Sequence, residues 1–130
     1  MHRGDTLLRP IIIANPKLKA HLWIVVTEPT ADGSCVMVNI TTPKGHRLDR
    51  TVVLQKGDHP FVQHESIISY GDAQIENVKD LLACVQCATA KRGKQQILPP
   101  LLRRIQDGVL KSPDTPHKVR EFCKALWGIR

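Results

Sequence analysis

Apolar and polar positions alternate along the first half of the chain in the way that short β-strands do. Apolar, largely β-branched runs stand at residues 6–13, 21–27, 35–41, 51–54 and 67–70. Gly, Pro, Asp and Asn residues separate most of these runs, and such turn residues between short strands are typical of a small curled sheet or barrel. The run at 21–27 hardly alternates, which predicts a strand buried on both faces.

The spacing of apolar residues changes after the turn signal Gly71-Asp72. Apolar residues then recur three and four positions apart, the period of an amphipathic helix, at 75–85, 101–109 and 119–126. Residues 73–78 also fit a last strand, with the helix starting near Lys79. Residues 91–94 are basic and contain a glycine, which predicts a turn that ends this helix.

These patterns predict a mainly β fold with C-terminal helices, an α+β protein built on a small SH3-like barrel of about five to seven strands. At 130 residues the chain is expected to form a single domain over 1–130. The β-barrel body is predicted at 1–78, with a helical part at 79–130 packed on it. No apolar run approaches the length of a membrane span, and the N-terminus lacks a basic-then-apolar signal pattern, so a cytoplasmic protein is expected.

The formal net charge of +7 bears on the choice of partner, because excess positive charge favours polyanions, nucleic acid first. A modest positive charge also simply keeps a protein soluble. The four cysteines include a lone Cys84-x-x-Cys87 pair without a second pair or a nearby histidine. In a cytoplasmic setting this predicts buried structural thiols rather than disulfides or a zinc site, and no cofactor.

The order of the elements resembles the MazF/PemK (Kid) family of small bacterial toxins. The likeness rests on Arg3-Gly4-Asp5 before the first strand, the apolar strand His21–Thr27, Val38–Thr42 with its terminal hydroxyl residues, and Ser66–Asp72 leading to an acidic residue. The resemblance implies an SH3-like barrel, a homodimer, metal-independent cleavage of single-stranded RNA, and neutralisation by a cognate antitoxin protein. The family arginine that holds the scissile phosphate just before the second strand is replaced here by Ala20-His21.

Cleavage of RNA through its own 2′-hydroxyl needs a base, an acid and positive charge on the phosphate. Histidine suits acid–base work near neutral pH, and His21 at a strand start is the first candidate, as acid, base or phosphate donor. Thr41, at the end of the neighbouring strand, is predicted to donate a hydrogen bond to a phosphate oxygen. Asp72 is predicted to act as a base or to orient the histidine. Ordinary strand-end and turn chemistry is the alternative for each.

Further residues are predicted to bind the RNA strand. Basic residues supply charge, His59 shapes the rim of the barrel, and Phe61 and Tyr70 are the aromatic rings placed to offer a surface on which a base stacks. The predicted RNA-binding set is Lys17, Lys19, Arg47, Arg50, His59 and Tyr70. For the loop residues Arg47 and Arg50, a merely solvated surface is the alternative.

Two other functions fit the sequence. One is a non-catalytic barrel that binds nucleic acid or a protein partner, which the missing arginine and the sparse aromatic residues favour. The other is a metal-dependent enzyme that uses His46, His59 and His64. Because nothing in the sequence fixes the mutual geometry of these histidines, no metal site is predicted.

Overall fold

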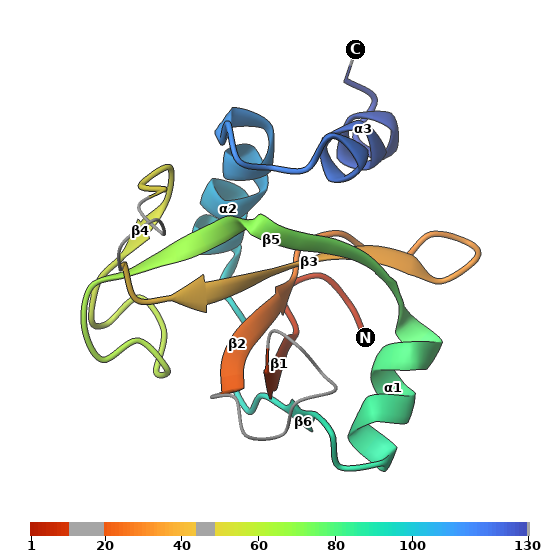
Figure 1. Ribbon diagram of the computed structural model, residues 1–130, viewed down its shortest axis with the longest axis horizontal. Helices are drawn as coiled ribbons and strands as arrows, with labels where there is room; N and C mark the ends of the chain where they lie inside the picture. The colour runs from red at the N-terminus through yellow and green to blue at the C-terminus, as the bar shows by residue number, and fades with distance from the viewer. Residues whose placement is uncertain (11–19, 44–48, 130) are drawn as a thin grey trace.

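The computed structural model describes residues 1–10, 20–43 and 49–129 (Figure 1). Over this part of the chain, six strands form one sheet in the order β4-β5-β3-β2-β1-β6, and neighbouring strands pair antiparallel. The strands are β1 Thr6–Pro10, β2 Ala20–Val25, β3 Ser34–Thr41, β4 Val53–Leu54, β5 Ser66–Asn77 and β6 Lys91–Arg92. The helices are α1 Val78–Gln86, α2 Pro99–Lys111 and α3 His117–Leu126. The predicted α+β, barrel-like fold is confirmed.

The sheet is covered on both faces, as the continuous apolar run at 21–27 predicts. In β2, Leu22 and Ile24 belong to a core that also contains residues of α2 and α3, whereas Trp23 and Val25 belong to a second core that contains Leu81 of α1. All four of these β2 residues are almost completely buried. Successive side chains of a strand point to opposite faces, so one apolar strand serves both cores.

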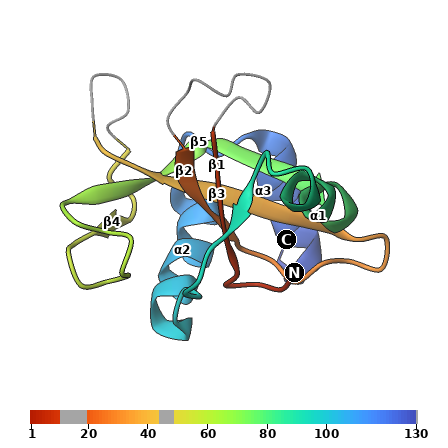
Figure 2. The ribbon, with the colours of Figure 1, turned by 90° about the horizontal axis from the view of Figure 1, so that it is seen from below.

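The two cores lie on opposite sides of a curled sheet. Figure 1 shows α2 and α3 on one side of the strands and α1 on the other. Figure 2 shows α1 and β4 at opposite ends of the sheet, so that α1 covers only one end of its face. A register shift in β3 between Met37 and Asn39 adds a bulge, and bulges increase the local twist of a strand.

The boundary between the last long strand and α1 agrees with one of the two alternatives left by the sequence. β5 continues to Asn77, whose side-chain oxygen accepts a hydrogen bond from the amide of Lys79 at 2.9 Å and so caps α1. None of the helices within the described residues has the length and apolarity needed to cross a membrane.

The basic segment predicted as a turn differs in the structure, since Lys91–Arg92 forms the edge strand β6 on β1. The pairing depends on Gly93, whose amide donates to the carbonyl of Thr6 at 2.9 Å. A β-carbon on Gly93 would lie 1.8 Å from the Thr6 hydroxyl, so only glycine allows this close approach. Two exposed charged residues give no strand pattern in the sequence, but such charges are common on edge strands.

Candidate active site on the concave face

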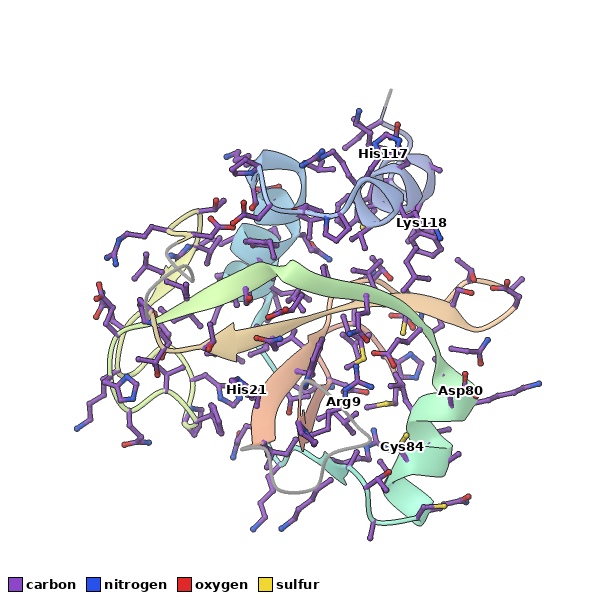
Figure 3. All side chains as sticks on the ribbon, in the orientation of Figure 1. Arg9, His21, Asp80, Cys84, His117 and Lys118 are labelled. Atoms are coloured by element: carbon purple, nitrogen blue, oxygen red, sulfur yellow. The ribbon has the colours of Figure 1, made fainter. Side chains whose placement is uncertain are left out.

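The face that carries Trp23 is the concave side of the curl. Arg9 on β1 donates hydrogen bonds to Glu76 and Gln74 on β5, although β2 and β3 lie between these strands in the sheet. This contact requires the sheet to bend until β1 faces the second half of β5. In Figure 3 the labelled Arg9, His21 and Cys84 lie on the inner side of the curl, away from α2.

His21 and Thr41 meet on this concave face. The β2–β3 ladder pairs Trp23 with Asn39, and alternation then places His21 and Thr41 on the same face at the strand ends. The Nδ1 atom of His21 lies 3.3 Å from the carbonyl oxygen of Ile40, which can only accept a hydrogen bond. Nδ1 therefore carries a proton, and Nε2 is the nitrogen at which the ring gains or gives up its second proton.

Asp72 is held on the same face by two donors. The hydroxyl of Ser69 donates to Asp72 Oδ2 at 2.7 Å, and the Nδ2 group of Asn39 donates to the same oxygen at 3.4 Å. Asn39 is completely buried, and its amide is fixed in this orientation because the opposite one would turn Oδ1 toward the carboxylate. The structure thus places His21 and Thr41 beside each other at the ends of β2 and β3, and Asp72 farther along β5 on the same face.

Asp72 opens into a pocket of about 210 Å³ that runs beside β5. Its lining is Asp49, Ile67, Ser69, Tyr70, Gly71, Asp72 and Asp114. Asp49 accepts hydrogen bonds from the hydroxyls of Thr51 and Ser112, each at 2.5 Å. Burial of the Asp49 carboxyl on its own would raise its pKa, but these hydrogen bonds from Ser112 and Thr51 outweigh that effect and leave the pKa below the ordinary value. The pocket therefore contains negative charge at neutral pH.

Arg9 is a charged residue of this face that the sequence analysis missed. Its side chain is 2% exposed, forms a bidentate ion pair with Glu76, and lies 4.4 Å from the centroid of the Trp23 ring. It is paired with His21 in the β1–β2 register, and its Nε atom is buried without a hydrogen-bond partner. The available signal was an arginine inside an apolar strand pattern, where a charge is buried only if it is paired.

The predicted RNA-binding residues separate into three groups. Lys17, Lys19 and Arg47 lie outside the described residues. Arg50 is exposed and donates to Glu65 at 2.7 Å, so part of its charge is already offset. His59 and Tyr70 form the third group, because both are buried.

The structure contradicts the stacking role predicted for Tyr70. The ring is 0% exposed and belongs to the core on the α2 side, where its hydroxyl donates to the carbonyl of Ile105 at 2.8 Å. A base has no access to this ring. Burial raises the pKa of the Tyr70 hydroxyl, which therefore stays protonated at neutral pH.

His59 also has a structural role instead of the predicted role at the RNA rim. Its Nδ1 accepts from the amide of Phe61 at 3.1 Å, so Nε2 carries the proton and donates to the carbonyl of Gln95 at 3.0 Å. The side chain is 7% exposed. It ties the loop before β5 to the segment before α2, and neither nitrogen is left for a phosphate or a metal.

Metal and thiol chemistry gain no support from the described side chains. No group of three or more His, Cys, Asp or Glu residues among them is arranged to hold a metal ion, and His46 lies outside the described part. The prediction of buried thiols is wrong for Cys87, which is exposed, whereas Cys84 is half-buried. Cys35 and Cys123 are buried, and burial raises the pKa of their thiols to about 11 and about 12. Both are therefore protonated and poorly reactive at neutral pH.

The arrangement as a whole can move protons at a polar ligand. It offers a histidine and a strand-end hydroxyl at one end of the concave face, and a hydrogen-bonded carboxylate farther along β5. No known protein-family model matches this chain, and no curated protein matches it.

Proposed function

We propose that this chain is a toxin-like, metal-independent endoribonuclease that cleaves single-stranded RNA by attack of a 2′-hydroxyl. The observation that carries the proposal is the placement of His21 and Asp72 on β2 and β5, on either side of β3, with Thr41 at the end of β3. Across the sheet, two strand spacings of about 4.8 Å separate β2 from β5. Along the strands the two residues are also staggered, since Ile67 of β5, and not Asp72, lies opposite Thr41. An RNA backbone that crosses β3 obliquely would pass between this acid and this base.

The two groups have complementary tasks in this chemistry. Asp72 takes the proton of the 2′-hydroxyl as its oxygen attacks phosphorus, and the protonated ring of His21 gives a proton to the 5′-oxygen as the P–O5′ bond breaks. The products are a 2′,3′-cyclic phosphate and a 5′-hydroxyl. Each positioned acid or base typically contributes about 10²–10⁴-fold. Thr41 donates a hydrogen bond to a phosphate oxygen.

Ser69 and Asn39 support this mechanism because they hold the Asp72 carboxylate in one orientation through Oδ2. Its other oxygen, Oδ1, accepts neither of these hydrogen bonds and is the one we assign to the substrate. Positioning of this kind is a large part of enzymatic rate enhancement, since a reacting group already in place pays no entropy at the moment of reaction.

The proposed partners follow from the same family resemblance. A homodimer is proposed, neutralised by a cognate antitoxin protein and acting on RNA in the cytoplasm. The formal charge of +7 supports attraction of a polyanion.

One observation favours a second candidate, a non-catalytic barrel that binds nucleic acid or a protein. Arg9 is neutralised by Glu76, and no described Lys or Arg forms an ion pair with Asp49, Asp72 or Asp114 in the pocket. A phosphate would meet more negative than positive charge there unless His21 is protonated. A barrel that only binds a partner has no such requirement.

Single substitutions separate the two candidates. Purified wild type, His21→Ala and Asp72→Asn are incubated with mixed-sequence single-stranded RNA in EDTA, with the exposed α1 residue Lys79→Ala as the matched control. The ribonuclease proposal expects wild type and Lys79→Ala to cleave, and both site variants to lose about 10²-fold or more. Equal cleavage by wild type and His21→Ala, with all four proteins folded, would reject the assignment of His21.

A further inference from the structure

Phe61 is the most accessible aromatic side chain of the protein. Its ring is 41% exposed, whereas Trp23 and Tyr70 are completely buried and the remaining two, Phe122 and Trp127, are half-buried against the core. Exposed single apolar residues are common, so exposure alone assigns no role to Phe61. The role of Phe61 is argued instead from the conformation of its loop.

The loop between β4 and β5 holds Phe61 outward. On one side, His59 is buried and bonded through both ring nitrogens, to the Phe61 amide at 3.1 Å and the Gln95 carbonyl at 3.0 Å. On the other side, Val62 is 3% exposed in the core, and its amide donates to the His59 carbonyl at 2.9 Å. Because both neighbours are anchored, the ring of Phe61 cannot fold inward to bury itself.

Two further hydrogen bonds brace the same loop. The amide of Gln55 donates to Asp58 Oδ2 at 2.7 Å, and the side chain of Gln63 donates to the carbonyl of Pro60 at 2.8 Å. The ring is thus presented on a fixed support. Binding to a rigid aromatic surface costs less ordering entropy than binding to a mobile one.

The loop lies at the end of the sheet that carries the proposed site. It leads directly into Ser66, the first residue of β5, and the next residue, Ile67, pairs with Thr41 at the end of β3. Figure 1 shows this loop beside the tip of β3, at the end of the sheet opposite α1. In Figure 3, His21 is labelled on the side of β2 that faces the loop.

The surroundings of Phe61 on the loop are polar. The other exposed loop residues are Gln55, Lys56, Gly57, Asp58, Pro60, Gln63, His64 and Glu65. An anchor for a protein partner normally stands within a larger apolar patch. Lys56 supplies positive charge on this loop, Asp58 and Glu65 supply negative charge, and Glu65 is paired with Arg50. A flat exposed ring in polar surroundings is the arrangement with which proteins bind unpaired nucleobases.

We propose that Phe61 is the stacking platform for a base of single-stranded RNA whose chain continues into the site formed by His21 and Asp72. The inference rests on the proposed function for the identity of the ligand. Of the two rings that the sequence placed where a base could stack, Phe61 and Tyr70, Phe61 is the exposed one. Stacking tolerates any base, so it predicts affinity for unpaired strands with little sequence preference.

Binding of a fluorescein-labelled, mixed-sequence 2′-O-methyl RNA of about ten nucleotides to the full chain tests the platform by anisotropy, since this strand lacks the attacking 2′-hydroxyl and is not cleaved. Phe61→Ala is expected to weaken binding about 5- to 100-fold. Phe61→Trp restores it, and Phe61→Leu does not, since Leu has no π-face. Leu98→Ala, which truncates an aliphatic side chain that is 68% exposed, is the matched control and leaves binding unchanged.

Thermal melting of each variant establishes that it is folded. Wild-type affinity in Phe61→Ala or in Phe61→Leu overturns the platform, as does an equal loss for Leu98→Ala.

The stacking role of Phe61 and the ribonuclease proposal can each be rejected without the other. Binding that depends on Phe61 without any cleavage retains the platform and rejects the nuclease, whereas cleavage that depends on His21 with wild-type affinity in Phe61→Ala does the reverse. If both hold, Phe61→Ala raises KM and leaves kcat nearly unchanged.

Discussion

The hydroxyl of Tyr70 occupies the space into which a β-carbon on Gly108 would project. That carbon would lie 1.9 Å from the hydroxyl and 2.6 Å from the ring carbon that bears it. The glycine therefore lets α2 lie directly on β5, where Tyr70 bonds to Ile105. The contact fixes the helix on the convex face of the sheet and closes the core beneath it.

The substitution Gly108→Ala tests this contact, because the contact and helix propensity predict stability changes of opposite sign. Helix propensity alone predicts that alanine stabilises α2 by about 1 kcal/mol. The clash with Tyr70 predicts a net loss of roughly 1–3 kcal/mol, since overpacking forces side chains and backbone to shift. Urea denaturation measures the difference, with the exposed α2 residue Asp107→Ala as control. A more stable Gly108→Ala protein would mean that α2 lies farther from β5 than the structure has it.

The ion pair between Arg9 and Glu76 predicts strong coupling in a double-mutant cycle. Either Arg9→Met or Glu76→Gln leaves one polar partner buried alone, and removal of one member of such a pair typically costs about 3–5 kcal/mol. The double variant is expected to cost less than the sum of the single ones. Denaturation of all four proteins measures the coupling energy.

Arg50→Met is the control for this cycle, because its ion pair with Glu65 is exposed. Its expected effect is at most about 1 kcal/mol. Additive effects of Arg9→Met and Glu76→Gln would show that the two side chains do not meet across the curl.

The lowered pKa of Asp49 predicts a contribution to stability that depends on pH. A carboxyl with a lower pKa in the folded state stabilises the protein above its unfolded pKa, and the contribution is lost as the pH falls through the folded value. The pH range in which this stability is lost therefore lies below 3.8, the ordinary pKa of an aspartate side chain. Wild type is expected to lose more stability between pH 7 and pH 3 than Asp49→Asn, which is already less stable at pH 7.

Urea midpoints at the two pH values measure this difference. Asp80→Asn, at an exposed position of α1, is the control and should follow wild type. Parallel curves for wild type and Asp49→Asn would mean that the hydrogen bonds from Ser112 and Thr51 do not favour the ionised form.

Local pattern was enough to predict most elements of the fold. The unbroken apolar run around Trp23 predicted a strand buried on both faces, and the three- and four-residue spacing predicted the helices. Both signals depend only on the period of the backbone. The strand β6 was missed because its formation depends on a glycine contact with Thr6, which no local pattern encodes.

The candidate site was predicted only in part, for a physical reason. His21 and Thr41 stand at strand ends, which can be recognised from sequence, whereas Asp72 lies within β5, where the sequence pattern wrongly predicted a turn at Gly71-Asp72. Whether a side chain is covered depends on distant residues: Tyr70 is buried by α2, and His59 is bonded to Gln95. Arg9 was missed because its partner Glu76 reaches it only through the curl of the sheet.

The most direct test of the proposed function compares RNA and DNA strands of the same mixed sequence, incubated with purified protein in EDTA, with analysis of the product ends. The proposed mechanism predicts cleavage of the RNA alone, leaving 2′,3′-cyclic phosphate and 5′-hydroxyl ends. Intact RNA, or cleavage of the DNA strand as well, would contradict attack by the 2′-hydroxyl and would favour a barrel that binds without cutting.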